Sequence, residues 1–324
     1  MYKYFAAMKR AIIILTALSV LAAASCTRGR YVTLSGYAQG GEYRVKVRMD
    51  GATATRRQIA ARIEDILTAV DTTFSGYNAN SLLSRINAGE AVEPNKMFLD
   101  LLAVSDRYRE LSEGAFDVCA GPLFDLWGFG FAGDSPPSPE RIEETIAECR
   151  KCKSFNFNAI AQGYTCDTIA RFLRSAGITD FLVDIGEIFC SGSNPSGKGW
   201  NIAIDTPIDG NVTPGASISG IWNSGGGSYG IVTSGNYRKF YIRDGRKYAH
   251  TIDPRTGYPV SHNLLSATVV APTATDADAL ATWFMVIGFE ESRSKVLSDP
   301  DLEACLICTD TIWFSPGFNG GGGY

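Results

Sequence analysis

The 324-residue chain lacks three features that would each point to a class of protein. It has no excess of basic residues, because 30 Lys and Arg face 34 Asp and Glu, for a net charge of −4. A nucleic-acid-binding domain usually carries a basic face, so this balance argues against nucleic acid as a partner. The chain also has no internal repeat and no linker long enough to separate two domains. Its length suffices for a large core, so one α+β domain is the simplest architecture.

Only the amino terminus contains a long apolar run. Residues 11–24 follow Lys3, Lys9 and Arg10 and end in small residues. A basic segment, a short apolar stretch and small residues are typical of a secretory signal. The run is too short and too rich in alanine for a permanent membrane span.

The small residues lead into Cys26, an order that resembles a bacterial lipoprotein cleavage box with Ala23 in place of the usual leucine. We expect residues 1–25 to be removed and Cys26 to carry lipid, which would anchor the chain at the membrane outside the cytoplasm. The alternative is a plain exported protein cleaved near Ala24. A tether over residues 26–35 would then precede the folded domain at 36–318 and a glycine-rich tail at 319–324.

The spacing of the cysteines resembles that of a zinc site, but the expected orientation of one pair argues against one. Cys149 and Cys152 form one C-x-x-C pair, and Cys305 and Cys308 form a second. Four such ligands suit zinc. The second pair, however, lies in a strand-like segment, where positions i and i+3 face opposite sides. We therefore expect buried packing or an incidental disulfide, and the first pair is either a surface disulfide or a reactive pair.

Apolar periodicity predicts several regular elements. In residues 56–74 apolar side chains recur at helical spacing, and Thr55 precedes them as an N-cap. From Trp200 onward, strands joined by glycine and proline turns are expected. Further helices are predicted at 96–111, 139–148, 163–175 and 275–287, and strands at 42–47, 181–185 and 267–270.

One predicted helix combines a carboxylate with a hydroxyl. Asp278 and Thr282 lie at i and i+4, so both side chains point from the same helix face. Oxygen ligands of this kind suit Mg²⁺. Asp276 lies on a different face, where the helix dipole would stabilise its charge. The alternative is a surface aspartate in the first turn and a threonine bonded to the backbone.

Polar groups are dense in residues 232–260, which include His250, one of only two histidines. Such groups are costly to bury without partners, so this density indicates a ligand. Residues 156–167 read as a strand entering a helix, and the free N–H groups of such a helix start suit a phosphate. The alternative is an ordinary turn in which Gly163 permits close packing.

Two further residues indicate a ligand site. Tyr77 follows the first helix beside glycine and asparagine and is predicted to be an exposed aromatic that stacks on a flat ring. The alternative is a tyrosine packed over a helix end. Asp117 stands among apolar residues and therefore requires a partner, either within the protein or on a ligand.

These segments, in this order, resemble the ApbE-type FAD:protein FMN transferases. The resemblance covers nearly all of the chain after the leader. Its strongest matches are G-A-F-D…G-P-L…L-W-G-F-G, T-S-G-N-Y-R…H-T-I-D-P-R-T-G-Y-P-V and A-D-A-L-A-T. It implies an α+β fold with mixed sheets that binds FAD in a cleft beside Mg²⁺.

The resemblance also implies roles for individual residues. The metal would be held by the Asp278 carboxylate, the Thr282 side chain and the Ala161 carbonyl. His250 and Asp253 would lie near the diphosphate, and Gln39 stands where the family often has methionine. The remaining residues expected at the FAD are Tyr77, Ala115, Phe116, Asp117, Asn158, Tyr164, the backbone near Ile252, and Gln162.

The implied reaction is the transfer of FMN from FAD to a threonine or serine hydroxyl of an exported acceptor protein, with release of AMP. Phosphoryl transfer of this kind depends mostly on positioning and charge neutralisation. His250 is the candidate base for the acceptor hydroxyl, or else it only hydrogen-bonds FAD. His262 has no matching role and is expected in a surface loop. The family's common A-K-G-Y is A-Q-G-Y here, with Gln162 in place of lysine.

Two rival activities remain open. Water in place of the acceptor hydroxyl would give a Mg²⁺-dependent FAD pyrophosphatase. A lipoprotein that only stores FAD is the second rival, and the missing positive charge at Gln162 favours it.

Overall fold

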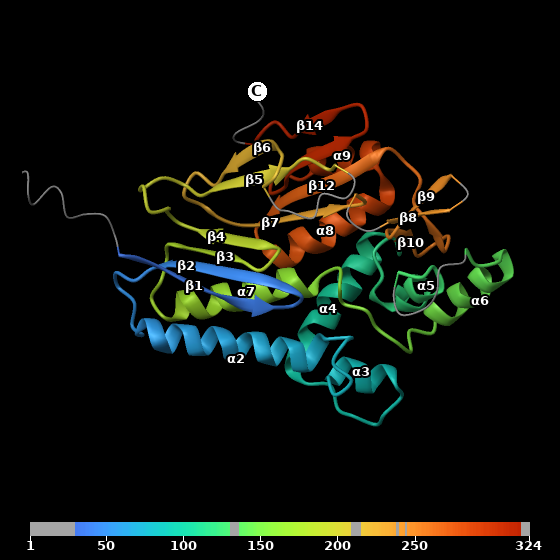
Figure 1. Cartoon of the computed structure of the whole chain (residues 1–324), viewed down its shortest axis with the longest axis horizontal. Helices are drawn as coiled ribbons and strands as arrows, with labels where there is room; N and C mark the ends of the chain where they lie inside the picture. Colours follow the sequence, from blue (N-terminus) through green and yellow to red (C-terminus); the bar gives the residue numbers. More distant parts are fainter. Residues whose placement is uncertain (1–29, 130–135, 209–214, 238–239, 244, 319–324) are drawn as a thin grey trace, which may run out of the picture.

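An eight-stranded sheet runs through the protein, with helices packed against it (Figure 1). The computed structural model describes residues 30–129, 136–208, 215–237, 240–243 and 245–318. The strand order is β1-β2-β3-β4-β7-β12-β13-β14, and every neighbouring pair is antiparallel. The α+β class is confirmed, but the expectation of mixed sheets is wrong. The strands of this sheet are β1 (Tyr31–Ala38), β2 (Gly41–Arg48), β3 (Phe181–Asp184), β4 (Ile188–Ser191), β7 (Ser228–Gly235), β12 (Leu264–Ala271), β13 (Glu303–Cys308) and β14 (Ile312–Phe314).

The first two strands form a tight hairpin. Ala38 pairs with Gly41, so Gln39 and Gly40 make a two-residue loop, and both have positive φ, at 51° and 83°. Turns of this kind match the twist of the flanking strands. Because β1 begins at Tyr31, the predicted tether over residues 26–35 is wrong in its second half.

The helices largely follow the predicted periodicity. Helix α2 (Arg56–Phe74) begins and ends as expected, and Thr55 caps it in a reciprocal pair of hydrogen bonds with Gln58. Such a capping box satisfies two otherwise free N–H groups. The other helices are α3 (Leu82–Asn87), α4 (Lys96–Leu111), η1 (Val118–Ala120), α5 (Gly121–Leu126), α6 (Pro139–Cys149), α7 (Ala161–Ser175), α8 (Ala274–Ile287) and α9 (Phe289–Ser298).

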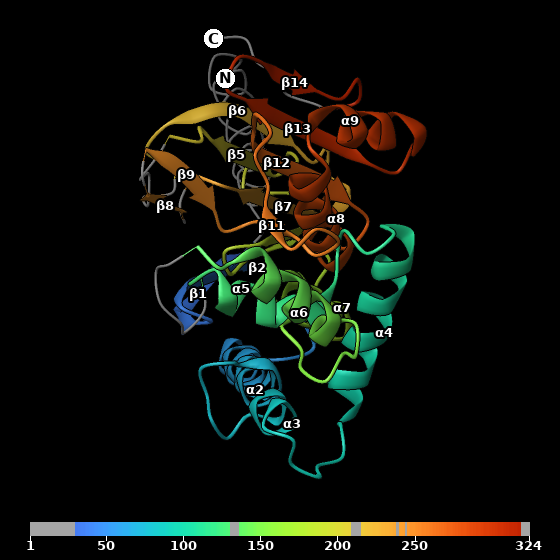
Figure 2. The same ribbon diagram turned by 90° about the vertical axis from the view of Figure 1, so that its right-hand side faces the viewer.

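The strand expected just before α7 is absent, since residues 156 and 157 have no regular structure and residues 158–160 form a turn that leads directly into the helix. Helices α2 and α7 pack on the face of β1 to β4, where Val45, Ile63, Ile169 and Phe181 lie in one core cluster. Helix α8 lies alongside β7 and β12, as Figure 2 shows. The opposite face is covered by the hairpin of β5 (Asn201–Asp205) and β6 (Ile218–Asn223).

Helices α7 and α8 touch at a glycine. A Cβ atom at Gly163 would lie 2.3 Å from the Ala274 carbonyl oxygen and 2.9 Å from the Asp278 Cβ. Real side chains never approach that closely, so the contact requires glycine. Gly230 on β7 makes a similar approach, with its Cβ position 2.2 Å from the Ala274 nitrogen. Two glycines thus bring the first turn of α8 against both α7 and the sheet.

The cysteines pair differently from their spacing. Cys119 forms a disulfide with Cys152, whereas Cys149 is a buried free thiol, so a Cys149–Cys152 bond is ruled out. Cys305 and Cys308 are both buried on β13 but contact different core clusters, which confirms their opposite orientation. The argument against a zinc site built from two C-x-x-C pairs therefore holds.

Among the described residues, no helix is both long enough and apolar enough to span a membrane.

Candidate functional site

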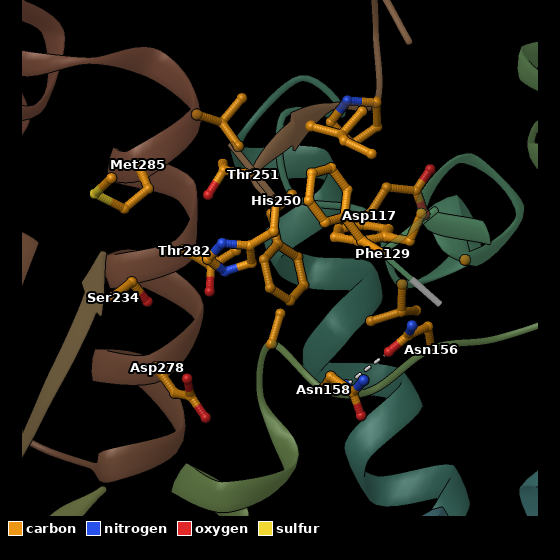
Figure 3. A pocket seen from close by; sticks show the side chains of 18 of the residues that line it. Asp117, Phe129, Asn156, Asn158, Ser234, His250, Thr251, Asp278, Thr282 and Met285 are labelled. Carbon is orange, nitrogen blue, oxygen red and sulfur yellow. Dashed lines mark hydrogen bonds between the residues drawn. The ribbon is translucent and has the colours of Figure 1, made fainter. Parts of the chain in front are cut away.

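A cavity of about 370 Å³ opens between α8, β7, the start of α7 and the segment around η1 (Figure 3). Its volume lies in the range of small-molecule and cofactor sites. Two short hairpins lie on its other side, β8 (Phe240–Arg243) with β9 (Arg246–Ala249) and β10 (Ile252–Asp253) with β11 (Tyr258–Pro259). The lining includes most residues predicted from the sequence, namely Tyr77, Ala115, Phe116, Asp117, Asn158, Gln162, His250, Ile252, Asp278 and Thr282.

Helix α8 presents the predicted carboxylate and hydroxyl to this cavity. Asp278 and Thr282 project from the same face of the helix one turn apart (Figure 3). Asp278 is 4% exposed, which rules out the alternative of a surface aspartate. Its Oδ2 accepts the Gly163 N–H at 3.0 Å. Burial raises the pKa of Asp278 to about 7 because water is removed from the charged form, and the nearby Asp167 raises it further.

The first turn of α7 lies beside Asp278. Its Gly163 N–H, predicted as a phosphate donor, is already bound to Asp278. The Ala161 carbonyl accepts the Thr165 hydroxyl at 2.7 Å, and Thr165 in turn accepts the Gln39 amide at 2.8 Å. Gln39 is not among the lining residues, and its contact with FAD stays a prediction. It acts on the start of α7 through Thr165 instead.

Gln162 lines the cavity and donates to the Ile185 carbonyl at 3.0 Å. Two residues on, Tyr164 turns the other way. It is 8% exposed, its ring lies edge-on to Phe74 at 6.0 Å, and it belongs to the core. Successive positions on a helix face different directions, so Tyr164 does not line the cavity as Gln162 does, and its contact with the flavin stays a prediction.

The wall opposite α8 comes from the segment before η1. Asp117 is mostly buried there, and burial raises its pKa above the usual range. Its partners are internal, since Oδ1 accepts the Cys119 N–H at 2.8 Å and Oδ2 lies 3.5 Å from the Arg109 guanidinium. Tyr77, 81% exposed, stands at the cavity as the predicted exposed aromatic. Nearby, Asn156 Oδ1 accepts the Asn158 N–H at 2.9 Å (Figure 3).

The third wall contains His250 and Ile252. In Figure 3 His250 points between Thr282 and Phe129, and its ring centroid is 6.3 Å from that of Phe129. Asp253 does not line the cavity. Its carboxylate accepts both the backbone N–H and the guanidinium of Arg255, each at 2.9 Å, and its place near the diphosphate stays a prediction.

Several lining residues were not singled out from the sequence. Ser234 and Asn156 lie inside motifs that were recognised, and Met285 follows Thr282 by three residues, so helical spacing identifies it. Phe129 is the phenylalanine of the L-W-G-F-G motif, so it too lies in a recognised segment. His262 lies in a loop as expected, but it is half-buried, because its Nε2 lies 3.0 Å from the Met285 carbonyl oxygen; burial lowers its pKa.

The described part of the chain holds no cluster of three or more His, Cys, Asp or Glu side chains arranged to bind a metal ion. A cation at the α8 end of this cavity would have the Asp278 carboxylate and neutral oxygens such as that of Thr282 as ligands. Such a ligand set suits Mg²⁺, which keeps several positions for water and substrate phosphates.

Comparison with known proteins agrees with this geometry. The chain is 34% identical to the FAD:protein FMN transferase of Haemophilus influenzae, over 91% of both chains. It is 32% identical to that of Escherichia coli K12, over 88% of this chain and 87% of the other. The flavin transferase ApbE of Vibrio cholerae is a similar solved structure, with a TM-score of 0.76, 31% identity, and coverage of 90% and 98%.

The apo flavinyl transferase ApbE of Pseudomonas stutzeri matches with a TM-score of 0.79 at 30% identity, covering 91% of this chain and 98% of that one. The ApbE family matches residues 39–306, a range that contains every residue lining the cavity. This chain belongs to the ApbE family.

Proposed function

We propose that this chain transfers FMN from FAD to a threonine or serine hydroxyl of an exported protein and releases AMP. The observation that carries the proposal is the pair of buried Asp278 and half-buried Thr282 at one end of a cofactor-sized cavity. The relatives named FAD:protein FMN transferases match this chain over about nine-tenths of its length. In this arrangement the flavin lies near Tyr77, Phe116 and Asn158, and the diphosphate lies near α8.

The residues at the α8 end fit a magnesium ion. Asp278 is a buried carboxylate whose pKa is raised to about 7, so its charged form lacks compensation that a cation would supply. Asp278 and Thr282 would hold the ion, and the Ala161 carbonyl, which accepts the Thr165 hydroxyl in the first turn of α7, would be a third oxygen. A bound Mg²⁺ supplies neutralisation of the diphosphate and of the departing AMP.

The protein's own groups position the acceptor and accept its proton. The acceptor oxygen forms a bond to the FMN phosphorus while the bond from that phosphorus to the AMP oxygen breaks. His250 lies in the cavity wall and would accept the hydroxyl proton. Phe129, Ile252 and Met285 make the neighbouring wall apolar, which limits access of water that would otherwise hydrolyse FAD.

We also propose that the chain acts outside the cytoplasm, anchored by lipid on Cys26. The signal-like residues 1–25 and Cys26 lie outside the described residues, so this part of the proposal depends on their sequence. The Cys119–Cys152 disulfide supports it, because such bonds persist in oxidising compartments. Mass spectrometry of the protein extracted from its membrane should find a lipidated Cys26 at the amino terminus. An unmodified terminus near Ala24, or a retained leader, would contradict this.

One assay separates the possible activities. The chain is incubated with FAD, Mg²⁺ and a membrane fraction of the organism that encodes it, and FAD, FMN, AMP and protein-bound flavin are followed. Covalent flavin on an acceptor together with AMP supports the transferase. Free FMN with AMP and no labelled acceptor would indicate a pyrophosphatase, and unchanged FAD would indicate a binding protein only.

Variants of α8 test the site assignment. Asp278→Ala should abolish Mg²⁺-dependent AMP release, because it removes the only carboxylate proposed to hold the ion. Thr282→Ala should be milder, since water can replace a neutral oxygen. Asp276→Asn is the matched control, because Asp276 lies on the same helix but pairs with Arg107. Wild-type turnover and Mg²⁺ dependence in a folded Asp278→Ala variant would place the metal elsewhere.

His250 has its own test. His250→Gln should lower kcat by about 100-fold or more while leaving the Kd for FAD within about twofold, as expected for loss of a general base. A rise in Kd with unchanged kcat would show that His250 only binds FAD.

A further inference from the structure

Helices α7 and α8 hold each other through two carboxylates that point in opposite directions. From α8, Asp278 accepts the Gly163 N–H of α7 at 3.0 Å. From α7, Asp167 accepts the N–H groups of Ala274 and Thr275 on α8, both at 2.9 Å, and also the Thr275 hydroxyl. Each helix therefore offers N–H groups of its first turn to a carboxylate of the other.

This arrangement leaves α7 and α8 little freedom to move past each other. Gly163 and Asp167 are one turn apart on α7, and Ala274 and Asp278 are one turn apart on α8. The contacts thus occur at two successive levels. A rotation or a slide of either helix would break bonds at both, and the close approach at Gly163 leaves no room between the backbones.

Asp167 is not needed merely to cap α8. That helix already has an N-cap, since Thr273 accepts the Asp276 N–H, and Asp276 places a carboxylate in the first turn. Asp167 is only 7% exposed, and burial raises its pKa, so keeping a carboxylate here is costly. Its three donors all come from α8 and offset that cost. The distinctive effect of Asp167 is therefore the link between α7 and α8.

We propose that Asp167 is a positioning residue for the metal end of the cavity. It fixes α8 so that Asp278 and Thr282 stay opposite the first turn of α7, where the Ala161 carbonyl and Gln162 lie. Asp167 does not line the cavity, so it acts through Asp278 rather than on the substrate. The inference rests on the proposed function, and it assigns a role to a buried group that the mechanism above leaves unused.

The test compares Asp167→Ala and Asp167→Asn with the control Asp276→Asn in the full chain. Three quantities are measured: binding of Mg²⁺ alone by calorimetry, kcat and KM from AMP release, and thermal melting. Asp167→Ala should weaken Mg²⁺ binding and lower kcat by about tenfold or more, as loss of an outer partner of a ligand does. At saturating Mg²⁺, KM for FAD should stay within about twofold of wild type. Asp167→Asn keeps one acceptor oxygen and should recover part of both losses, whereas Asp276→Asn should leave both near wild type.

Each outcome decides the proposal. Asp167 variants that melt lower but keep wild-type Mg²⁺ affinity and kcat would show a purely structural role. Equal losses in Asp276→Asn would assign the effect to charge at the helix start and also overturn the link. If Asp167→Ala does not fold, Asp167→Asn alone decides. A wild-type chain that binds Mg²⁺ but never releases AMP would refute the transferase activity. The Mg²⁺ affinities of the Asp167 variants, measured by calorimetry, would then still test the positioning role of Asp167. A wild-type chain that binds no Mg²⁺, either alone or with FAD present, would refute both.

Discussion

Reduction of the Cys119–Cys152 disulfide should weaken both the fold and the flavin end of the cavity. The two cysteines are 33 residues apart, and closing a loop of this length stabilises the folded state by about 4 kcal/mol through the entropy of the unfolded chain. Cys119 follows Val118, whose carbonyl accepts the Asn156 N–H at 2.7 Å. The disulfide thus ties the wall at 115–118 to the wall that carries Asn156.

The assay is urea denaturation with and without a dithiol. The dithiol reduces the protein disulfide to two thiols and is itself oxidised to a disulfide. Alkylation and mass spectrometry confirm the state of each cysteine. Reduction should lower the free energy of unfolding by up to about 4 kcal/mol and weaken FAD binding several-fold, because the two walls are then less preorganised. The double variant Cys119→Ser/Cys152→Ser should behave like the reduced protein.

Cys149→Ala provides the control, because Cys149 is a buried free thiol beside the disulfide. This variant should keep the full response to the dithiol. If urea midpoints and FAD affinity are identical before and after complete reduction, the bond stabilises neither the fold nor the cavity. Free Cys119 and Cys152 in the untreated protein would show that the bond does not form.

Three further predictions concern the cavity. Tyr77→Ala should weaken binding of FAD by about 1 kcal/mol more than binding of ADP in calorimetry, because the lost contact is to the flavin ring; equal losses would refute stacking. Gly163→Ala should lower the free energy of unfolding by about 1–3 kcal/mol or more and reduce Mg²⁺ affinity, because the new methyl group would lie 2.3 Å from the Ala274 oxygen; unchanged melting would contradict the close packing. The affinity for Mg²⁺ should rise as the pH rises toward 7 and level off above it, because Asp278, with a pKa of about 7, must lose its proton to bind a cation. Titration calorimetry from about pH 5.5 to 8.5 checks this, and an affinity that does not change with pH would contradict it.

The helices could be predicted well where their signals are local. Residues 56–74 combine an apolar period with a capping box at Thr55, and the helix follows both. Helix α7 begins two residues earlier than predicted. Its N-cap residue, Ile160, makes no side-chain hydrogen bond, so the sequence carries no capping signal for this start. Strand β1 was missed since only Leu34 of its eight residues is buried, which leaves no alternating pattern.

Long-range pairing could not be predicted in the same way. Strands β2 and β3 are neighbours although more than 130 residues separate them, and nothing in either strand fixes the direction of the pairing. The Cys119–Cys152 bond has no spacing signature, while the conspicuous C-x-x-C pairs form no disulfide. Such connectivity depends on tertiary packing, which the sequence pattern does not contain.

The candidate site shows the same difference between relations within one helix and relations that depend on tertiary packing. Asp278 and Thr282 could be placed together because their relation is internal to one helix. Gln39, Tyr164 and Asp253 were assigned by position in the motifs, which gives the neighbourhood of a residue but not the direction of its side chain. Gln39 and Asp253 turn to protein partners, Thr165 and Arg255, and Tyr164 turns into the core.

The charges around the cavity would make the proposed binding of a cation and of FAD interdependent. Among the described lining residues, Asp117, Glu187 and Asp278 carry carboxylates and none is Lys or Arg. Arg109 lies beside Asp117, which leaves the α8 end acidic. Gln162 stands where ApbE-type sequences commonly have lysine, so this side chain adds no positive charge there. A diphosphate placed against Asp278 without a cation would be repelled, and a cation on one carboxylate would be held weakly without the diphosphate. Each ligand therefore lowers the cost of binding the other, so we expect the affinity for FAD to rise with Mg²⁺ and the affinity for Mg²⁺ to rise by the same factor with FAD.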